Sequence, residues 1–410
     1  MSRFARYVRQ ARRSRYDVPW CVPAWGWNEL RACVGRTVAG RVVRGGDAEH
    51  FAASVAQRLG RRFGVPVNRG RTAIQIGLTA LGVQPGDDVV VSTYVCRTAI
   101  DGILAAGARP VFADVSSDLH LTVESVGAAV TSSTRCIVVP HLFGGTAPVD
   151  EIERFASGLG IELLDDAAQS FGARRAGRPI GSFGRGGIVA VGAGKSLAGA
   201  AGGVFVTDDA GVARRARQVM ELLPEEGATV AVRRVAEYWM WRRLRRQSLP
   251  IKMVLDRYAG GGEAPHVASR LSNLDAAIAR EQLASIEENV RIRRVNSERF
   301  ADALGIAQEY IVSEMSESAT HVKIALVLPE EGPDAETLIE MLSAAGIEAQ
   351  RGYRPCHLDF APDAHLPVAE ALWERLVCLP TETAPSVTTL RRLALCIRDV
   401  MLAQPAMCIR

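Results

Sequence analysis

The sequence predicts an α/β protein: a large domain with a mostly parallel sheet between helices, followed by a small α+β domain. From Val89 onward, short β-type runs alternate with helical stretches at roughly 20–30-residue spacing, as in successive βαβ units. The 410 residues also exceed what one small core needs. We expect a basic N-terminal appendage at 1–19, the large domain at 20–250 and the small domain at 251–410.

The composition indicates a soluble globular protein. Charged residues make up 23% of the chain and the net charge is only +4, which gives no reason to expect nucleic-acid binding. No apolar run approaches the roughly 20 residues that span a bilayer. The eight cysteines are scattered, without a CxxC pair or zinc-ligand spacing, and we recognise no signal peptide. We therefore expect reduced thiols and a cytoplasmic location.

The N-terminal residues are rich in arginine, with Arg3, Arg6, Arg9 and Arg13 on one helical face. A transit peptide has a similar composition, and so does a solvated or partner-facing helix. We treat this segment as an appendage.

The first motif is the segment Asn68–Thr72, which precedes the helical pattern AIQIGLTALG. A helix that begins after a glycine offers unpaired N–H groups to a phosphate, although a plain glycine turn gives the same pattern. Strands are predicted next at 88–92, 109–114, 136–140 and 161–166. Two more, at 187–191 and 203–207, are close enough in the chain to pair antiparallel.

A basic and aromatic helix follows, with its arginines between Arg233 and Arg246. It either buries an aromatic face and leaves a solvated basic face, or rests on an anionic membrane surface or an acidic partner. Pro250 and the glycines at 260–262 mark a linker. Beyond it we predict one long amphipathic helix over 272–294, a strand within 321–328 and a final helix.

Lys195 is one of only three lysines and lies in the Gly/Ala-rich segment 192–203. An amine that forms a Schiff base must be partly neutral, which a tight, desolvated loop favours. Asp165 and Asp166, at the end of an apolar run, can supply a carboxylate for the ring nitrogen of pyridoxal phosphate (PLP). Because strand residues alternate, only one of the two reaches the ring.

These residues resemble the DegT/DnrJ/EryC1/StrS aminotransferases, PLP-dependent enzymes of the aspartate aminotransferase fold (PLP fold type I) that aminate keto sugars on nucleotide carriers. The resemblance runs from about Trp25 to about Arg398. It rests on the order and spacing of loose motifs: GRTAIQIGLTALGVQPGDDVVVSTY, GARPVFADV, LLDDAAQSFGARRAGRPIGSFG, the Lys195 segment, SRLSNLDAAIAREQL and GIEAQRGYRPCHL.

The resemblance implies roles for individual residues. Lys195 matches the lysine that holds PLP, Asp166 the partner of the pyridine nitrogen, and Gln169 the residue near the phenolic oxygen. Gly70 and Arg71 match a Gly-Thr pair whose backbone N–H groups hold the phosphate, and Thr72 and Tyr94 are also expected at the cofactor.

Three positions depart from the family pattern. Ala190 replaces a phosphate-binding serine, Cys96 an aromatic that stacks on the cofactor, and Ala268 an asparagine from the partner subunit. An inward-turned Arg71 guanidinium could compensate at the phosphate, with Tyr94 or Cys96 covering the ring. Alternatively, Arg71 is solvated and Cys96 is a small core residue.

The resemblance also implies a substrate side of the pocket. Tyr353 and His357 match the segment that reaches it, and His141 follows a strand end beside it, where a purely structural histidine is equally compatible. A homodimer is implied, with Arg270 and Asn273 reaching each site from the neighbouring chain.

We therefore expect a PLP-dependent aminotransferase that takes an amino group from an amino acid, glutamate first, and gives it to a keto sugar nucleotide or related ketone. A PLP lyase or desulfurase of the same fold remains an alternative, as does a non-catalytic DegT-like regulatory protein. Cys96 is the residue that a desulfurase would need as nucleophile.

Overall fold

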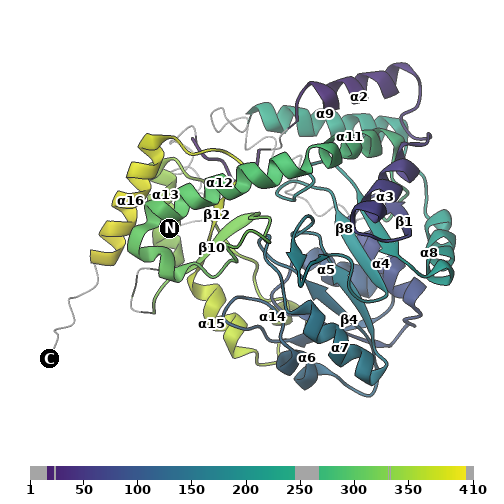
Figure 1. The fold of residues 1–410 in the computed structure, drawn as a ribbon, viewed down its shortest axis with the longest axis horizontal. Coiled ribbons are helices and arrows are strands. Elements are labelled where there is room, and N and C mark those ends of the chain that lie inside the picture. The colour runs from purple at the N-terminus through teal and green to yellow at the C-terminus, as the bar shows by residue number, and fades with distance from the viewer. Residues whose placement is uncertain (1–15, 23–24, 245–266, 331, 333, 403–410) are drawn as a thin grey trace.

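The computed structural model describes residues 16–22, 25–244, 267–330, 332 and 334–402. Its largest element is a seven-stranded sheet with the order β1-β9-β8-β5-β4-β2-β3, flanked by helices on both faces (Figure 1). The strands β2, β3, β4, β5 and β8 are parallel, whereas β9 runs antiparallel to both β8 and β1. The bounds are β1 (Phe63–Val67), β2 (Asp88–Ser92), β3 (Arg109–Ala113), β4 (Thr134–Pro140), β5 (Glu162–Asp166), β8 (Gly186–Ala190) and β9 (Gly203–Thr207).

Alternation along the strands creates a hydrophobic core on each face of this sheet. In β2, Val90 packs into one core and Val89 and Val91 into the other. Both faces of a parallel sheet are covered in this way, so the strands read as continuous apolar runs. One face is covered by α3 (Asp47–Arg58), α6 (Val123–Ala129), α7 (Val149–Leu159) and α11 (Asn273–Ala284), and the other by α4 (Gly70–Leu81), α5 (Arg97–Ala105) and α8 (Ala210–Leu222).

A second, antiparallel sheet has the order β10-β12-β11 and its own apolar core. It is built from residues far along the chain, as the predicted α+β part requires. A separate two-stranded hairpin, β6 (Arg174–Arg175) with β7 (Arg178–Pro179), follows β5. The other elements here are β10 (Lys323–Val327), β11 (Gln350–Arg351), β12 (Leu376–Pro380), α13 (Ala335–Ala345), α14 (His357–Phe360), α15 (Pro367–Arg375), α16 (Val387–Leu402) and the 3₁₀ helix η1 (Gly305–Tyr310).

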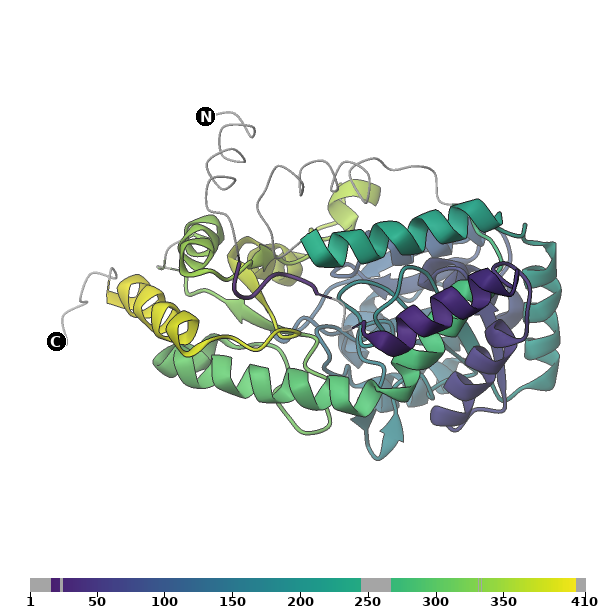
Figure 2. The same cartoon turned by 90° about the horizontal axis from the view of Figure 1, so that it is seen from above.

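The single helix predicted over 272–294 is wrong, because the structure has two helices there. α11 ends at Ala284 and α12 (Ile286–Leu304) begins after Ser285. The Ser285 hydroxyl donates to the carbonyls of Glu281 and Gln282, both at 3.3 Å, and such bonds compete with the helical pattern. α12 then runs from the large sheet to the small one (Figure 2).

The division into domains at 20–250 and 251–410 remains our proposal. α11 falls in the second range, yet it packs into the core of the large sheet. Conversely, Val18 forms a β-bridge with Ile347 beside the small sheet, and the Trp20 N–H donates to the Glu348 carboxylate at 2.8 Å. The four arginines of the predicted N-terminal appendage lie outside the described residues.

The basic and aromatic helix is α9 (Ala228–Leu244), which lies with α2 (Trp27–Val38) on the outside of α11 (Figure 1). The Tyr238 and Trp239 rings pack on the buried Trp25, with centroids 4.5 and 5.9 Å away, as the buried-aromatic-face interpretation expects. Arg234 is not solvated, because it forms ion pairs with Glu226 and Asp275. Arg245 and Arg246 lie outside the described residues.

In the described part of the chain, no helix combines the length and the apolar composition needed to cross a membrane.

Candidate active site

A cavity of about 190 Å³ lies at the carboxyl ends of β4, β5 and β8, where α4 and α5 begin. This is the edge at which α/β sheets bind ligands, since loops and helix N-termini converge there. Seven of the predicted site residues line it, although they come from five separate stretches of sequence. They are Gly70, Arg71, Cys96, His141, Asp166, Gln169 and Lys195.

The floor of the cavity is the first turn of α4. Its N-cap residue, Arg69, is extended (φ −150°, ψ 157°), and the Arg69 side chain makes no capping hydrogen bond. A Cβ built on Gly70 would lie 2.8 Å from the Cβ of Ala190 in β8, so only glycine allows this approach. The N–H groups of the first turn and the positive end of the helix dipole can therefore receive an anion.

Thr72 is not in the cavity lining. It is fully buried, and its hydroxyl donates to the Asn68 Oδ1 at 2.9 Å. Asn68 also donates to the Ser269 hydroxyl at 2.7 Å and to the Val267 carbonyl at 3.1 Å. Thr72 thus helps to fix the start of α4, and the segment on both sides of Ala268 lies against that start in the same chain.

Asp166 faces the cavity from the last position of β5. Its Oδ1 accepts the N–H of Ala168 at 2.9 Å. Burial raises the pKa of Asp166, and neither this hydrogen bond nor the charge of Lys195 fully offsets the effect. A buried carboxyl with a raised pKa is suited to a cationic partner.

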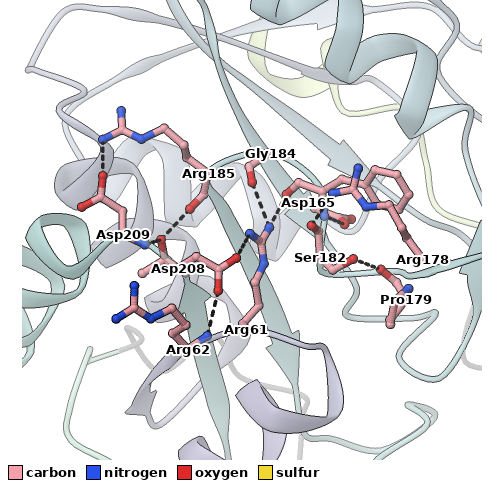
Figure 3. A network of polar contacts seen from close by, with 12 residues as sticks. Arg61, Arg62, Asp165, Arg178, Pro179, Ser182, Gly184, Arg185, Asp208 and Asp209 are labelled. Atoms are coloured by element: carbon pink, nitrogen blue, oxygen red, sulfur yellow. Dashed lines mark hydrogen bonds and ion pairs between the residues drawn. The ribbon is translucent and has the colours of Figure 1, made fainter.

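Asp165 points to the opposite side of the strand, as the alternation predicts. Its Oδ1 lies 2.9 Å from Nε2 of His141, and its Oδ2 accepts the N–H groups of Gly181 and Phe183 at 2.6 and 2.9 Å. Figure 3 shows it beside the turn at 178–184. Arg61 holds the same turn by donating to the carbonyls of Phe183 and Gly184, both at 2.9 Å.

His141 has a protein partner at each ring nitrogen. The Ala147 N–H donates to Nδ1 at 2.9 Å, so Nε2 carries the proton that bonds Asp165. The ring borders the cavity with its nitrogens already engaged. These contacts favour the structural interpretation of His141 over the substrate role.

Lys195 lies in a loop that returns on itself after β8. The Gly192 N–H donates to the Leu197 carbonyl at 3.0 Å, and the Lys195 N–H to the Gly192 carbonyl at 3.3 Å. The Lys195 side chain is half-buried and lines the cavity together with Asp166. The two groups that the sequence pairs on chemical grounds are therefore neighbours in space.

Gln169 connects the cavity to the small sheet. Its Oε1 accepts the Phe143 N–H at 3.3 Å, and its Nε2 donates to the Tyr353 hydroxyl at 3.2 Å.

Tyr94 is fully buried beside Tyr353, with its ring centroid 6.1 Å from that of Tyr353. Burial holds the pKa of the Tyr94 hydroxyl well above its usual value of 10. Tyr94 does not line the cavity, so Cys96 is the one of the two that borders it.

Arg71 is neither fully turned into the cavity nor fully solvated, and Cys96 is neither fully open to the cavity nor fully buried. The Arg71 guanidinium reaches Asp101 in α5 through a single contact of 3.3 Å, and 27% of the side chain is exposed. The Cys96 sulfur lies 3.2 Å from the Thr98 hydroxyl at the start of α5. Both border the cavity, and neither is simply solvated or simply core.

Four predicted substrate residues are absent from the cavity lining, namely Tyr353, His357, Arg270 and Asn273. Buried His357 contacts the Thr93 hydroxyl at 2.7 Å and the Glu370 carboxylate at 3.2 Å. Arg270 and Asn273 bond within their own chain: Arg270 with Leu223, Glu221 and Glu225, and Asn273 with Asp47 and Arg41. Their part in a neighbouring subunit's site remains a prediction.

Sequence reasoning missed Arg69 and Arg293. Arg69 lines the cavity and donates to the Ala200 carbonyl at 2.7 Å, and burial lowers its pKa. The guanidinium of Arg293 donates to the Lys195 carbonyl at 2.9 Å. In a chain whose basic residues are nearly all arginine, nothing in the sequence singles out these two.

Residues 27–397 match the model of the DegT/DnrJ/EryC1/StrS aminotransferase family. The chain belongs to this family. It is 31% identical over 356 residues to the L-glutamine:2-deoxy-scyllo-inosose aminotransferase of Streptomyces fradiae, an alignment that covers 85% of this chain and 79% of the relative. The resemblance stated from the motifs is confirmed, and the protein is an aminotransferase.

Solved structures agree on the fold. DesI, described in the presence of its TDP-sugar product, superposes with a TM-score of 0.75 at 25% identity, covering 95% of this chain and 94% of DesI. The Escherichia coli GDP-4-keto-6-deoxy-D-mannose-3-dehydratase with bound hydrated PLP gives 0.75 at 21% identity, covering 93% and 100%. The predicted fold class, α/β and aspartate aminotransferase-like, is confirmed.

Proposed function

We propose that this aminotransferase depends on PLP and transfers an amino group from glutamate or glutamine to a cyclic ketone, either a keto cyclitol or a keto sugar nucleotide. The observation that carries the proposal is the single cavity that joins Lys195, the buried Asp166 and the uncapped start of α4. The Lys195 amine would bind the aldehyde of PLP, the Asp166 carboxylate its ring nitrogen, and the start of α4 its phosphate.

The residues present fit this cofactor. The close approach of Gly70 to Ala190 places the first turn of α4 against the end of β8, which forms a cradle for a phosphate. The pKa of Asp166 is raised by burial, which the charge of nearby Lys195 does not offset, and a protonated ring nitrogen would stabilise the carboxylate further. Gln169, held by Phe143 and Tyr353, lies in the same lining.

Bound PLP would supply an electron-accepting ring that stabilises negative charge at the α carbon of the amino donor. The chain supplies the remaining groups. Lys195 Nζ would hold the cofactor, and its free amine would serve as the base that takes the proton from the donor's α carbon. Asp166 would keep a proton on the ring nitrogen, and the N–H groups of Gly70 and Arg71 would hold the phosphate.

The acceptor class follows from the relatives. The Streptomyces fradiae enzyme is named for 2-deoxy-scyllo-inosose, and DesI for a TDP-sugar. We place the keto cyclitol first, because the cyclitol relative is the more similar of the two in sequence. We also propose a cytoplasmic homodimer, as the family implies.

The test is the visible absorption of the purified protein with PLP, before and after glutamate or glutamine is added, alongside Lys195→Ala. We expect a cofactor band in the wild type that an amino donor bleaches, and neither effect in the variant. Mass spectrometry then follows amination of 2-deoxy-scyllo-inosose. A band that ignores every amino donor would favour a lyase, and the absence of a band would favour a non-catalytic protein.

A further inference from the structure

Arg293 lies on α12, and its charged side chain is buried, with only 5% of its surface exposed. Its Nη2 donates to the Lys195 carbonyl at 2.9 Å and to the Glu382 carboxylate at 2.6 Å, and its Nη1 donates to the Val322 carbonyl at 3.3 Å. One guanidinium thus binds the loop of the candidate catalytic lysine and the small sheet at the same time.

The partners of Arg293 are themselves fixed. The Thr381 hydroxyl donates to the Val322 carbonyl at 2.9 Å, and Asn296, one turn along α12, donates to the Thr381 carbonyl at 2.8 Å. The second carboxylate oxygen of Glu382 accepts the Val22 N–H at 2.8 Å. The segment after β12 is therefore a rigid support from which Arg293 reaches Lys195.

The cluster joins charges of opposite sign, with Arg293 and Lys323 beside the Glu382 carboxylate. Burial alone would raise the pKa of the Glu382 carboxyl, but the charges of Arg293 and Lys323 hold it below its usual value of 4.5. Glu382 is then ionised at neutral pH and forms a buried ion pair with Arg293. Loss of one partner of such a pair leaves the other charge uncompensated, so the position of the guanidinium is strongly determined.

The internal bonds of the Lys195 loop join Gly192 to Leu197 and the Lys195 N–H to Gly192, whereas the Lys195 carbonyl accepts from Arg293. Gly192 and Gly194 both precede the lysine, and Gly194 has a φ of +71°. The Lys195 amine also sits on a flexible four-carbon stem. The stem has a fixed length, so the position of the Lys195 main chain limits where the amine can reach. The hydrogen bond from Arg293 to the Lys195 carbonyl fixes that main chain.

We propose that Arg293 is a positioning residue for Lys195, which sets the reach of the amine and couples it to the placement of the small sheet through Glu382. This inference rests on the proposed function, because it assigns Lys195 the reacting amine. The arginine acts through the main chain of Lys195 and touches no substrate.

The experiment compares Arg293→Lys and Arg293→Met with the matched control Arg291→Met. Arg291 lies on the same helix but is 63% exposed, and its ion-pair partner among the described residues is Glu288. A lysine at position 293 keeps a positive charge near Glu382, but its single ammonium does not reproduce the two-armed contact. Each protein is saturated with PLP, and three quantities are measured: kcat, the KM of the amino donor, and the pH midpoint of the visible cofactor band.

We expect both Arg293 variants to lose about 10- to 100-fold in kcat, as a displaced reacting group does, with the KM of the donor changed less than about threefold. The pH midpoint of the band shifts, because the amine sits differently against the cofactor and Asp166. Arg291→Met keeps all three values. Variants that lose thermal stability but retain the kcat and midpoint of the wild type would show a purely structural role and overturn the proposal.

Glu382→Gln keeps the inference testable if Arg293→Met does not fold. It retains the shape of the side chain and weakens the hold on Arg293, so we expect the same changes at smaller size. A wild-type midpoint in both Glu382→Gln and Arg293→Lys contradicts the proposal. A wild-type protein without any cofactor band instead contradicts the proposed function, and this inference falls with it.

Discussion

The carboxylate of Asp165 lies 2.9 Å from Nε2 of His141, and both side chains are fully buried. Its neighbour Asp166 faces the cavity on the other side of β5. Two consecutive aspartates therefore have different roles: Asp165 holds the surrounding turn and His141 in place, and Asp166 presents a carboxyl group to the cavity. Their substitutions should differ accordingly.

Asp165→Asn should destabilise the fold. The carboxylate accepts from His141, Gly181 and Phe183, whereas an amide turns one oxygen into a donor that faces another donor. His141 cannot respond by changing tautomer, because its Nδ1 already accepts from Ala147. We expect the free energy of unfolding to fall by about 3 kcal/mol, measured by urea denaturation. An unchanged denaturation midpoint would contradict this account.

Asp166→Asn should stabilise the PLP-free protein at neutral pH. The pKa of Asp166 is raised in the folded state, so folding favours the protonated acid, and its ionisation costs stability as the pH rises through that value. The variant removes this cost, and its advantage should shrink as the pH falls toward the ordinary value of 3.8. Urea denaturation without PLP from about pH 8 to about pH 4 measures the difference. The same variant should lose transamination.

Cys96→Ala should retain amination of the ketone. The thiol borders the cavity, and in the proposed reaction no bond is made to sulfur. We expect kcat within about threefold of the wild type, since the change removes only a small side chain. The matched control is Cys356→Ala nearby, where burial raises the pKa of the thiol to about 12. Release of sulfur from cysteine by the wild type, lost in Cys96→Ala alone, would establish the desulfurase alternative.

Arg71→Thr should weaken PLP binding by about 10- to 100-fold, the size of one charge-assisted hydrogen bond. The side chain borders the cavity, and within the described part of the chain its ion-pair contact is the one of 3.3 Å with Asp101. Binding of pyridoxal, which lacks the phosphate, should change little and serves as the control. Adding Ala190→Ser should recover part of the affinity, because it returns a hydroxyl beside the start of α4. Fluorescence titration gives both dissociation constants.

Much of the fold could be predicted because periodicity records burial directly. The strands predicted at 88–92, 109–114, 136–140 and 161–166 correspond to β2, β3, β4 and β5, and the antiparallel pairing of β8 with β9 follows from their closeness in the chain. The break at Ser285 was not predicted, because the hydrogen bonds of its hydroxyl to the Glu281 and Gln282 carbonyls leave no trace in the apolar pattern. β1 was also missed, since its strand FGVPV contains both glycine and proline.

Within the site, residues that lie beside a strand end or a glycine turn could be found, and those that act from a distance could not. Asp166 and Lys195 occupy such positions and meet in the cavity. Tyr94 and His357 are equally prominent in the motifs, yet they are absent from the cavity lining and buried. Arg293 reaches Lys195 from α12 by tertiary packing alone, which no local pattern encodes.

The pairing of β1 with β9 has a consequence for how the site is made. α4 follows directly after β1, so the cradle at Gly70 takes its place only when Val67 has paired with Gly203, a residue far along the chain. Contacts between such distant residues form late in folding. The start of α4 and the end of the Lys195 loop are therefore completed by the same strand pairing, and a chain that ends before β9 lacks the contact that holds the proposed phosphate cradle in place.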